Sequence, residues 1–380
     1  RAELYMSLSL SYFKLGDFER GEKYLRDSNN IRAKLKDKRG ILLNYTRLSS
    51  VFILKRDFER VIDICNEALK VEPNLVEFYI ILIRGYAYIE LNEYEQAIKD
   101  FNKVIELNPN YAEAYYGRGY AYAELNEYER AIEDYSNAIA LNPDDAKAYY
   151  NRGNAYVKLN EYERAIKDYD KAIALNPDDA KAYYNRGYAY AELNEYERAL
   201  EDFSNAIALN PNDAKAYNNR GNAYAKLNEH ERAIEDYDRA IALNPALAEA
   251  YGNRGIAYSE IQRYEESARD LKKAGILFLR SGREEDAVKI FSFCFKLRDK
   301  IEIENDDIVY CGLALLLLTS DAGVMNELKG MRIRDENLRR ILELTMRKLR
   351  KEDISEEMAV LVGKEKRNEM MPLLELLKRF

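Results

Sequence analysis

Five proline residues recur along the middle of the chain at a fixed interval of 34 residues. They are Pro109, Pro143, Pro177, Pro211 and Pro245, and Pro73 precedes the first of them by 36 residues. A period of this length is typical of repeat architectures, in which each repeat is one supersecondary unit that buries its apolar surface against its neighbours. The interval therefore predicts a stack of similar units.

Taking each proline as position 32 of a repeat divides most of the chain into 34-residue repeats. The repeats between residues 78 and 247 are closely similar, and fainter copies flank them. The strong repeats are 78–111, 112–145, 146–179, 180–213 and 214–247, and the divergent ones are 2–35, 42–75 and 248–281. We therefore expect an array of about eight repeats over residues 1–281.

Each repeat has the pattern of two helices. In repeat 146–179, apolar and small residues follow helical spacing twice, first at Tyr149, Gly153 and Tyr156 and then at Tyr162, Ala165, Tyr169 and Ala172. Asn160 lies between the two sets, where a residue that tolerates the left-handed conformation can end a helix. The same position holds Asn92, Asn126, Asn194 and Asn228, and Gly16 in the first repeat. The repeat is therefore predicted to be an antiparallel helix pair.

The repeat resembles the tetratricopeptide repeat. The matching pattern has an aromatic residue at position 4, Gly at 8, Tyr at 11, Ala at 20, an aromatic at 24, Ala at 27 and Pro at 32, with Tyr in place of the usual Trp. The resemblance implies an all-α fold, a right-handed superhelical solenoid of antiparallel helix pairs. The period fails after about residue 274, and an array end needs a cover for its apolar face, so residues 282–380 are expected to form a non-repeat helical C-terminal cap.

Two charged positions depart from the family pattern together. Position 7 is Arg and position 23 is Asp in the same six repeats, whereas Leu8 and Tyr24, and Leu48 and Ile64, occupy them in the first two. Because charge is present at both positions or at neither, we expect the side chains to meet in a structural ion-pair ladder. Its members are Arg84, Asp100, Arg118, Asp134, Arg152, Asp168, Arg186, Asp202, Arg220, Asp236, Arg254 and Asp270.

A longer period alternates between neighbouring repeats. Position 9 alternates Tyr and Asn, and position 13 alternates Glu124, Lys158, Glu192, Lys226 and Glu260. Stacking brings equivalent positions side by side, so we expect opposite charges to be neighbours along the array.

The resemblance implies where a partner would bind. In this family the first helix of each repeat lines a concave groove through positions 2, 5, 6, 9, 12 and 13. The candidate partner-binding residues are therefore Tyr116, Tyr120, Lys147, Tyr150, Asn151, Asn154, Lys181, Tyr184, Asn185, Tyr188, Lys215, Asn219 and Asn222. Tyr and Asn suit an extended peptide or a partner helix. The alternative for position 5 is that its Tyr only packs between neighbouring hairpins.

One subtype of the family grips the acidic C-terminal tails of chaperones with a fixed set of Lys, Arg and Asn residues. Asn154, Asn185 and Lys215 supply three members of that set, but Tyr150 and Asn219 stand where two cations are required. The resemblance therefore implies only a weak anion clamp.

Composition argues against several other classes of function. The chain has one histidine, His230, and neither a glycine-rich phosphate loop nor a paired metal-ligand motif, so we expect no catalysis, no metal and no cofactor. A net charge of -8 disfavours nucleic acid as a partner, and the absence of a run of about 18 apolar residues disfavours a membrane span. Three scattered cysteines favour the cytoplasm; because the chain opens at Arg1, a processed extracellular product is the alternative.

The C-terminal region carries two further features. Helices are expected near residues 307–319, 322–330, 335–350, 354–363 and 366–379. The segment 329–351 is basic, which favours either a solvated helix face or an anion-binding surface. The last helix is apolar around most of its circumference, so we expect it to be docked, with a homo-oligomer through this helix as an alternative.

Three hypotheses for function follow from these patterns. The first is a scaffold that holds a peptide or partner protein in the groove. The second is a structural protein whose solenoids join end to end or side by side. The third is the regulatory arm of a larger enzyme or nucleic-acid complex. The sequence names neither the partner nor the organism.

Overall fold

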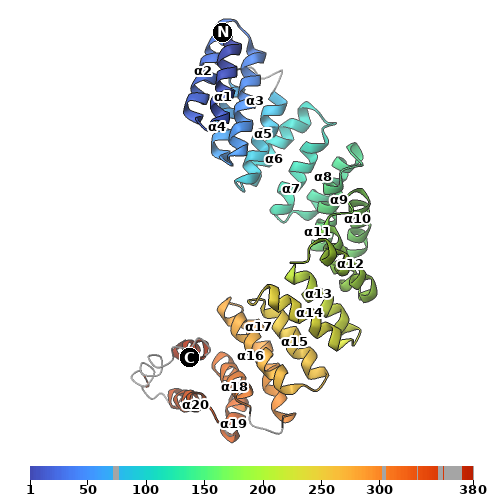
Figure 1. The fold of residues 1–380 in the computed structure, drawn as a ribbon, viewed down its shortest axis with the longest axis vertical. Coiled ribbons are helices and arrows are strands. Elements are labelled where there is room, and N and C mark those ends of the chain that lie inside the picture. The colour runs from blue at the N-terminus through green and yellow to red at the C-terminus, as the bar shows by residue number, and fades with distance from the viewer. Residues whose placement is uncertain (72–76, 302–304, 332, 350–353, 355–369, 380) are drawn as a thin grey trace. The chain divides into compact units, whose positions relative to one another are not determined.

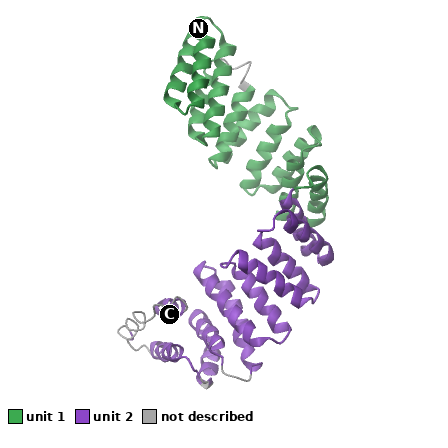
Figure 2. Ribbon diagram, in the orientation of Figure 1, with its two compact units in different colours: residues 1–178 green, residues 179–380 purple. Residues whose placement is uncertain are grey.

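The computed structural model describes residues 1–71, 77–301, 305–331, 333–349, 354 and 370–379. Its regular elements are all helices, and no strand occurs among these residues (Figure 1). The chain divides into two compact units, Arg1–Asp178 and Asp179–Phe380 (Figure 2). The all-α class expected from the sequence is confirmed, whereas the handedness of the superhelix stays a prediction.

The first compact unit consists of five consecutive helix pairs. Within each pair the two helices pack against each other, and each second helix packs against the first helix of the next pair. The helices are α1 (Ala2–Lys14), α2 (Phe18–Lys34), α3 (Lys38–Leu54), α4 (Phe58–Leu69), α5 (Glu77–Glu90), α6 (Tyr94–Leu107), α7 (Ala112–Glu124), α8 (Tyr128–Leu141), α9 (Ala146–Lys158) and α10 (Tyr162–Leu175).

The second compact unit continues the pairs and adds a non-repeat part. Its paired helices are α11 (Ala180–Glu192), α12 (Tyr196–Leu209), α13 (Ala214–Lys226), α14 (His230–Leu243), α15 (Ala248–Glu260) and α16 (Tyr264–Arg280). Helix α16 also packs against α17 (Glu284–Lys296), which is followed by the 3-10 turn Leu297–Asp299. The remaining helices are α18 (Asp306–Thr319), α19 (Ala322–Gly330), α20 (Glu336–Leu349) and α22 (Met371–Arg379).

The turn inside each pair is set by one residue in the left-handed conformation. Asn126 has φ of 61° and follows the C-cap of α7. Its N–H donates to the carbonyl of Ala123 (3.0 Å), and the N–H of Glu127 donates to that of Tyr122 (2.9 Å), which is a Schellman motif. The other residues with positive φ at such turns are Gly16, Arg56, Asn92, Asn160, Asn194, Asn228, Gln262 and Gly282.

The divergent second repeat begins earlier than the proline register suggests. Helix α3 starts at Lys38, four residues before the expected boundary at residue 42, because Asp37 caps it by accepting the N–H of Gly40 (2.9 Å). Lys36 makes the turn that precedes it, with φ of 58°. A side chain with a Cβ is disfavoured in this conformation.

We expect glycine at position 36 to stabilise this turn. Lys36→Gly should raise the free energy of unfolding by about 1 kcal/mol, because it relieves the left-handed strain. Lys23→Gly, on the exposed side of α2, should instead lower it by about 1 kcal/mol, since glycine is a poor helix former. Urea denaturation followed by circular dichroism measures the free energy of unfolding of both variants. A change of the same sign in the two variants would contradict this account of the turn.

Small and aromatic residues fill the space between paired helices. Ala165 and Tyr169 of α10 are 0% exposed, and Gly153 of α9 lies directly against the Tyr169 ring. A Cβ placed on Gly153 would lie 2.8 Å from Cε1 of Tyr169, closer than packed atoms allow. The small residues at positions 8 and 20 therefore let the two helices approach closely, and the aromatic residue at position 24 fills the remaining space between them.

The C-terminal part has a continuous core around α18. Residues Ile308–Leu317 of this helix are buried on every side, and they pack with α16, α17, α19, α20 and α22. The last helix begins at Met371 in the structure, and the helix expected at 354–363 lies almost wholly outside the described residues. Leu373, Leu374 and Leu377 of α22 are 0% exposed, so this helix is docked.

Candidate functional site

Within each compact unit, the first helices of successive repeats lie next to one another and present a surface. We call the residues at repeat positions 2, 5, 6, 9, 12 and 13 the first-helix face. In the first compact unit, α7 and α9 contact each other and supply Tyr116, Tyr120, Lys147, Tyr150, Asn151 and Asn154. In the second, α11 and α13 contact each other and supply Lys181, Tyr184, Asn185, Tyr188, Lys215, Asn219 and Asn222.

A hydrogen-bonded seam joins positions 5 and 6 of adjacent repeats. Nδ2 of Asn151 donates to the hydroxyl of Tyr116 (2.8 Å), and Nδ2 of Asn219 donates to that of Tyr184 (2.9 Å). Where position 5 is Asn218, the amide of Asn253 in the next repeat donates to its oxygen (3.1 Å). The seam thus fixes the side chains of two neighbouring first helices relative to each other.

The tyrosines at position 5 are packed and hydrogen-bonded. The Tyr116 ring centroid lies 5.9 Å from that of Tyr135, and Tyr184 lies 5.8 Å from Phe203, which are both at position 24 of the same repeat. Burial raises the pKa of the Tyr116 and Tyr184 hydroxyls. These tyrosines therefore pack within their own repeat and are hydrogen-bonded to the next one, and they are half-buried on the first-helix face. The binding role expected for position 5 stays a prediction.

Position 9 alternates between a buried contact and an exposed ring. The Asn154 amide oxygen accepts a hydrogen bond from the Tyr169 hydroxyl (2.7 Å), and Asn222 accepts one from Tyr237 (2.8 Å). Tyr188 stands at the same position in the repeat between them, and 36% of it is exposed. In the second compact unit, Tyr188 is therefore the exposed aromatic side chain at position 9 of the first-helix face.

Lysines provide the positive charge of the first-helix face. Lys147, Lys181 and Lys215 are exposed at position 2, next to the aspartates that cap their helices. Among the described residues, no ion pair joins Glu124 to Lys158 at position 13, and the expectation that opposite charges are neighbours along the array stays a prediction. Glu124 instead accepts a hydrogen bond from the Tyr94 hydroxyl (3.5 Å). Among the described residues, no ion pair involves Lys147, Lys181 or Lys215, so their charge is available at the surface.

The structure brings together the arginines and aspartates of positions 7 and 23. Arg118 Nε donates to Oδ2 of Asp134 (2.7 Å) and Nη2 to Oδ1 (2.6 Å), a bidentate pair that closes the helix pair α7/α8. Arg84, Arg152, Arg186, Arg220 and Arg254 form the same two bonds to Asp100, Asp168, Asp202, Asp236 and Asp270. The aspartates are buried, and the arginines retain about a fifth of their exposure.

Five of the ladder arginines, Arg84, Arg118, Arg152, Arg220 and Arg254, also reach back to the preceding repeat, a contact that the sequence reasoning missed. Arg118 Nη1 donates to Asn102 (2.5 Å), and Arg152 Nη1 donates to Ser136 Oγ (2.9 Å). Both acceptors are at position 25, where a polar residue recurs in every repeat that precedes such an arginine. That recurrence was the available signal. The arginine therefore ties together three helices from two repeats.

A second arginine, at position 19, contacts both helices of the pair near the turn that joins them. The sequence reasoning did not predict these contacts. The Arg164 Cζ lies 4.2 Å from the Tyr156 ring centroid, and its Nη2 donates to the Tyr156 hydroxyl (2.7 Å). Nη1 of the same residue pairs with Glu161 (2.6 Å). The same cluster forms around Arg130, Arg198 and Arg232. These contacts link the first helix, the turn and the second helix of the repeat.

The basic C-terminal segment uses several of its charges within the chain. Lys348 Nζ donates to the carbonyls of Leu377 (2.7 Å) and Lys378 (3.1 Å), which end α22. Arg340 pairs with Glu343 (3.2 Å), and Arg339 donates to the carbonyl of Ile333. Arg350 lies outside the described residues. Lys348 therefore links α20 to α22, whereas Arg339 and Arg340 make contacts close to them in the sequence.

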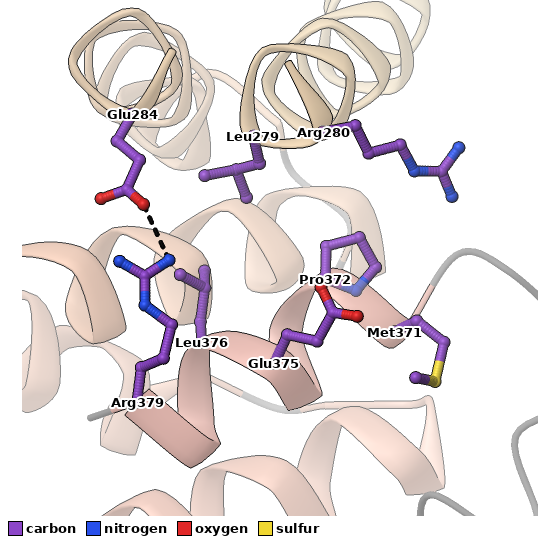
Figure 3. Close-up of a pocket in the computed structure, with 8 residues that line it drawn as sticks. All are labelled: Leu279, Arg280, Glu284, Met371, Pro372, Glu375, Leu376 and Arg379. Carbon is purple, nitrogen blue, oxygen red and sulfur yellow. Dashed lines mark ion pairs between the residues drawn. The ribbon is translucent and has the colours of Figure 1, made fainter. Parts of the chain in front are cut away.

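A small cavity lies where α22 meets α16 and α17 (Figure 3). Leu279, Met371, Pro372 and Leu376 provide its apolar lining, and the Glu284 carboxylate pairs with Arg379 across its edge (2.7 Å) (Figure 3). Charges of both signs surround it, with Arg280 and Glu375 completing the lining. The cavity marks the docking of α22 and has no cluster of one charge or of catalytic groups.

Among the described residues, no group of three or more His, Cys, Asp and Glu side chains is placed to hold a metal ion. None of the described helices is both long enough and apolar enough to span a membrane. Cys65, Cys294 and Cys311 are free and buried. Asn44, in the one glycosylation sequon, is 0% exposed inside α3.

The geometry described above defines an all-helical repeat protein with a surface made by its first helices. Models of the tetratricopeptide repeat match the chain at residues 2–34, 85–126, 119–160, 153–194, 187–228, 214–247 and 248–274. The chain belongs to the tetratricopeptide-repeat family. This confirms the resemblance seen in the sequence.

A solved structure has the same fold. The chain is similar to a tetratricopeptide repeat protein from Parabacteroides merdae, with 22% identity and a TM-score of 0.50 over 66% of this chain and 98% of that one. MamA matches at 28% identity and a TM-score of 0.41, over 42% of this chain and 94% of its own. YrrB, described as a protein with an unusual peptide-binding site, matches at 28% identity and a TM-score of 0.43, over 50% of this chain and 97% of its own. The comparison with curated proteins found no match.

Proposed function

We propose that the chain is a protein-interaction scaffold whose first-helix face holds an extended peptide segment of a partner protein. The observation that carries this proposal is the seam of Asn and Tyr side chains, such as Asn219 with Tyr184, which is ordered before any partner arrives. Ordered side chains lose little conformational entropy on binding, so a face of this kind gains affinity from modest contacts.

The part of the face at the N-termini of α11 and α13 favours a peptide with acidic side chains, while Glu192 adds negative charge at the other end of α11. In the second compact unit, Lys181 and Lys215 are exposed at the same position of successive repeats, and Tyr188 is exposed between them in the chain. Phenol and amide groups contact and hydrogen-bond a peptide backbone, while lysines attract carboxylates. The alternative functions are less well supported, because the apolar side chains of α22 are already covered and the described basic residues near it are engaged.

The proposal predicts that lysines of the first-helix face contribute to binding and other lysines do not. Peptides selected from a random library on the unmodified chain should bind the Lys181→Ala, Lys215→Ala variant about tenfold more weakly, since each exposed charge pair contributes up to about 1 kcal/mol. The matched control is Lys167→Ala, Lys171→Ala, which removes two exposed lysines from the second helix α10. Fluorescence anisotropy measures both dissociation constants.

Two outcomes would contradict the proposal. Equal weakening by both pairs of substitutions would mean that binding follows net charge and not the first-helix face. Unchanged binding in the first variant, together with unchanged binding in Tyr188→Ala, would place the peptide on another surface.

A further inference from the structure

The first helices α11, α13 and α15 of the second compact unit carry different chemistry at repeat position 9. Tyr188 of α11 is 36% exposed and Ile256 of α15 is 37% exposed, whereas the helix between them has the amide of Asn222 at this position. Helix α13 contacts both of its neighbours. Across the first-helix face, a polar side chain is therefore flanked by two exposed apolar ones.

Helix α13 offers hydrogen-bond donors and positive charge at positions 2, 9 and 13. The Asn222 amide oxygen accepts a hydrogen bond from the Tyr237 hydroxyl (2.8 Å), so the amide nitrogen is the group that a ligand can use. Lys226 is exposed one helical turn from Asn222, and Lys215 is exposed two turns away on the same side. Among the described residues, no ion pair involves either lysine. The face of α13 therefore favours an acidic side chain.

Helix α15 extends its apolar surface beyond Ile256. Gly252 lies one turn before Ile256, at position 5, where the two preceding first helices have Tyr184 and Asn218. The half-buried Ile290 of α17 lies against Gly252, with its Cδ1 atom 3.3 Å from the place of a Cβ on that glycine. We call Ile256, Gly252 and Ile290 the α15 patch, which suits an aliphatic side chain.

The spacing of packed helices matches the repeat of a polyproline II peptide. Neighbouring packed helices lie about 8–10 Å apart, and one turn of polyproline II takes three residues and rises about 9 Å. Every third residue of such a peptide therefore faces the next first helix. Glu192 on α11 and Glu260 on α15 occupy the position of Lys226, so the charges favour a carboxylate over α13 and disfavour one beside it.

We propose that the second compact unit binds a polyproline II segment with apolar side chains at i and i+6 and an acidic side chain at i+3. The apolar side chains rest on Tyr188 and on the α15 patch, and the carboxylate binds Asn222 and Lys226. The motif is the same read in either direction, so it holds for both orientations of the segment. This inference rests on the proposed function, because it specifies the peptide that the first-helix face holds.

Peptides selected from a random library on the full chain should be enriched in this motif. In a selected peptide, exchanging the acidic residue at i+3 with the residue at i+4 keeps composition and charge. The exchange should weaken binding about tenfold in fluorescence anisotropy, because the carboxylate then faces away from α13.

A charge reversal in the chain tests the assigned contact. Lys226→Glu should weaken the selected peptide about tenfold, and a peptide with Lys at i+3 should bind this variant about tenfold more tightly than it binds the unmodified chain. Such a rescue excludes damage to the fold. The matched control is Arg239→Glu, which makes the same change of charge at an exposed position on the second helix of the same repeat and should leave binding unchanged.

The possible outcomes separate this inference from the proposed function. Selected peptides that lose affinity with Lys181→Ala, Lys215→Ala but show no dependence on the i+3 residue would overturn the inference and leave the proposed function standing. Equal weakening by Lys226→Glu and Arg239→Glu, or no rescue by the peptide with Lys, would also overturn the inference. Peptides insensitive to every substitution on the first-helix face, or no selected peptide at all, would contradict both.

Discussion

Replacing Asp134 by alanine should lower the free energy of unfolding by about 3 kcal/mol, because it leaves the Arg118 guanidinium without its carboxylate in a largely buried site. Asp134 is 2% exposed and accepts two hydrogen bonds from Arg118. Burial raises the pKa of the Asp134 carboxyl, and hydrogen bonding to Asp134 raises the pKa of Arg118. The aspartate is thus costly to bury and is held there by its partner.

The chain itself provides the matched control for this loss. In the second repeat, Leu48 and Ile64 occupy the two ladder positions, and both are 1% exposed. The double variant Arg118→Leu, Asp134→Ile should therefore recover most of the stability and remain within about 1 kcal/mol of the unmodified chain, since well-packed apolar pairs often replace buried ion pairs without loss. Single and double variants together form a double-mutant cycle.

Urea denaturation and hydrogen exchange of the α7 and α8 amides measure this cycle. Exchange is needed because contacts in a repeat array link only neighbours, so that unfolding can be local. A single variant as stable as the unmodified chain would show that the ladder is dispensable. A double variant less stable than either single one would show that the site requires charge and not volume.

The second large effect is expected at the closest approach between paired helices. Gly153→Leu should destabilise the chain by about 3 kcal/mol, because even the first added carbon would lie 2.8 Å from Tyr169, whose ring is fully buried. The ring cannot move without opening the contact between α9 and α10. Thermal unfolding followed by circular dichroism measures the loss.

Gly252→Ala separates this clash from the general effect of replacing a helical glycine. The nearest atom to a Cβ at Gly252 is the flexible end of Ile290, at 3.3 Å, so alanine there should be neutral or stabilise by up to about 1 kcal/mol through its better helix propensity. If Gly153→Leu is as mild as Gly252→Ala, the tight packing described here is wrong.

Much of the fold could be predicted because the same residue types recur at the same positions of successive repeats. The left-handed turn at Asn160 follows from a conformational preference that recurs at a fixed position. The contact between Arg118 and Asp134 could be predicted because Arg at position 7 and Asp at position 23 occur together in the same repeats. Both predictions rest on repetition within one sequence.

What escaped prediction depends on contacts between repeats. The bond from Arg152 to Ser136 joins positions 7 and 25 of different repeats, and a serine gives no signal of its own. The early start of α3 depends on the cap at Asp37, which the spacing of the prolines does not indicate. The half-buried state of Tyr116 depends on how closely the repeats stack, which the spacing of residues along one helix does not determine.

The central claim, that partners bind on the first-helix face, is tested most directly by photo-cross-linking a selected peptide to the full chain. A photoreactive phenylalanine analogue would replace Tyr188, which is exposed on α11, or Tyr196, which begins the second helix α12. The account predicts that the peptide is captured at position 188 and not at position 196. Capture at 196 alone would contradict it.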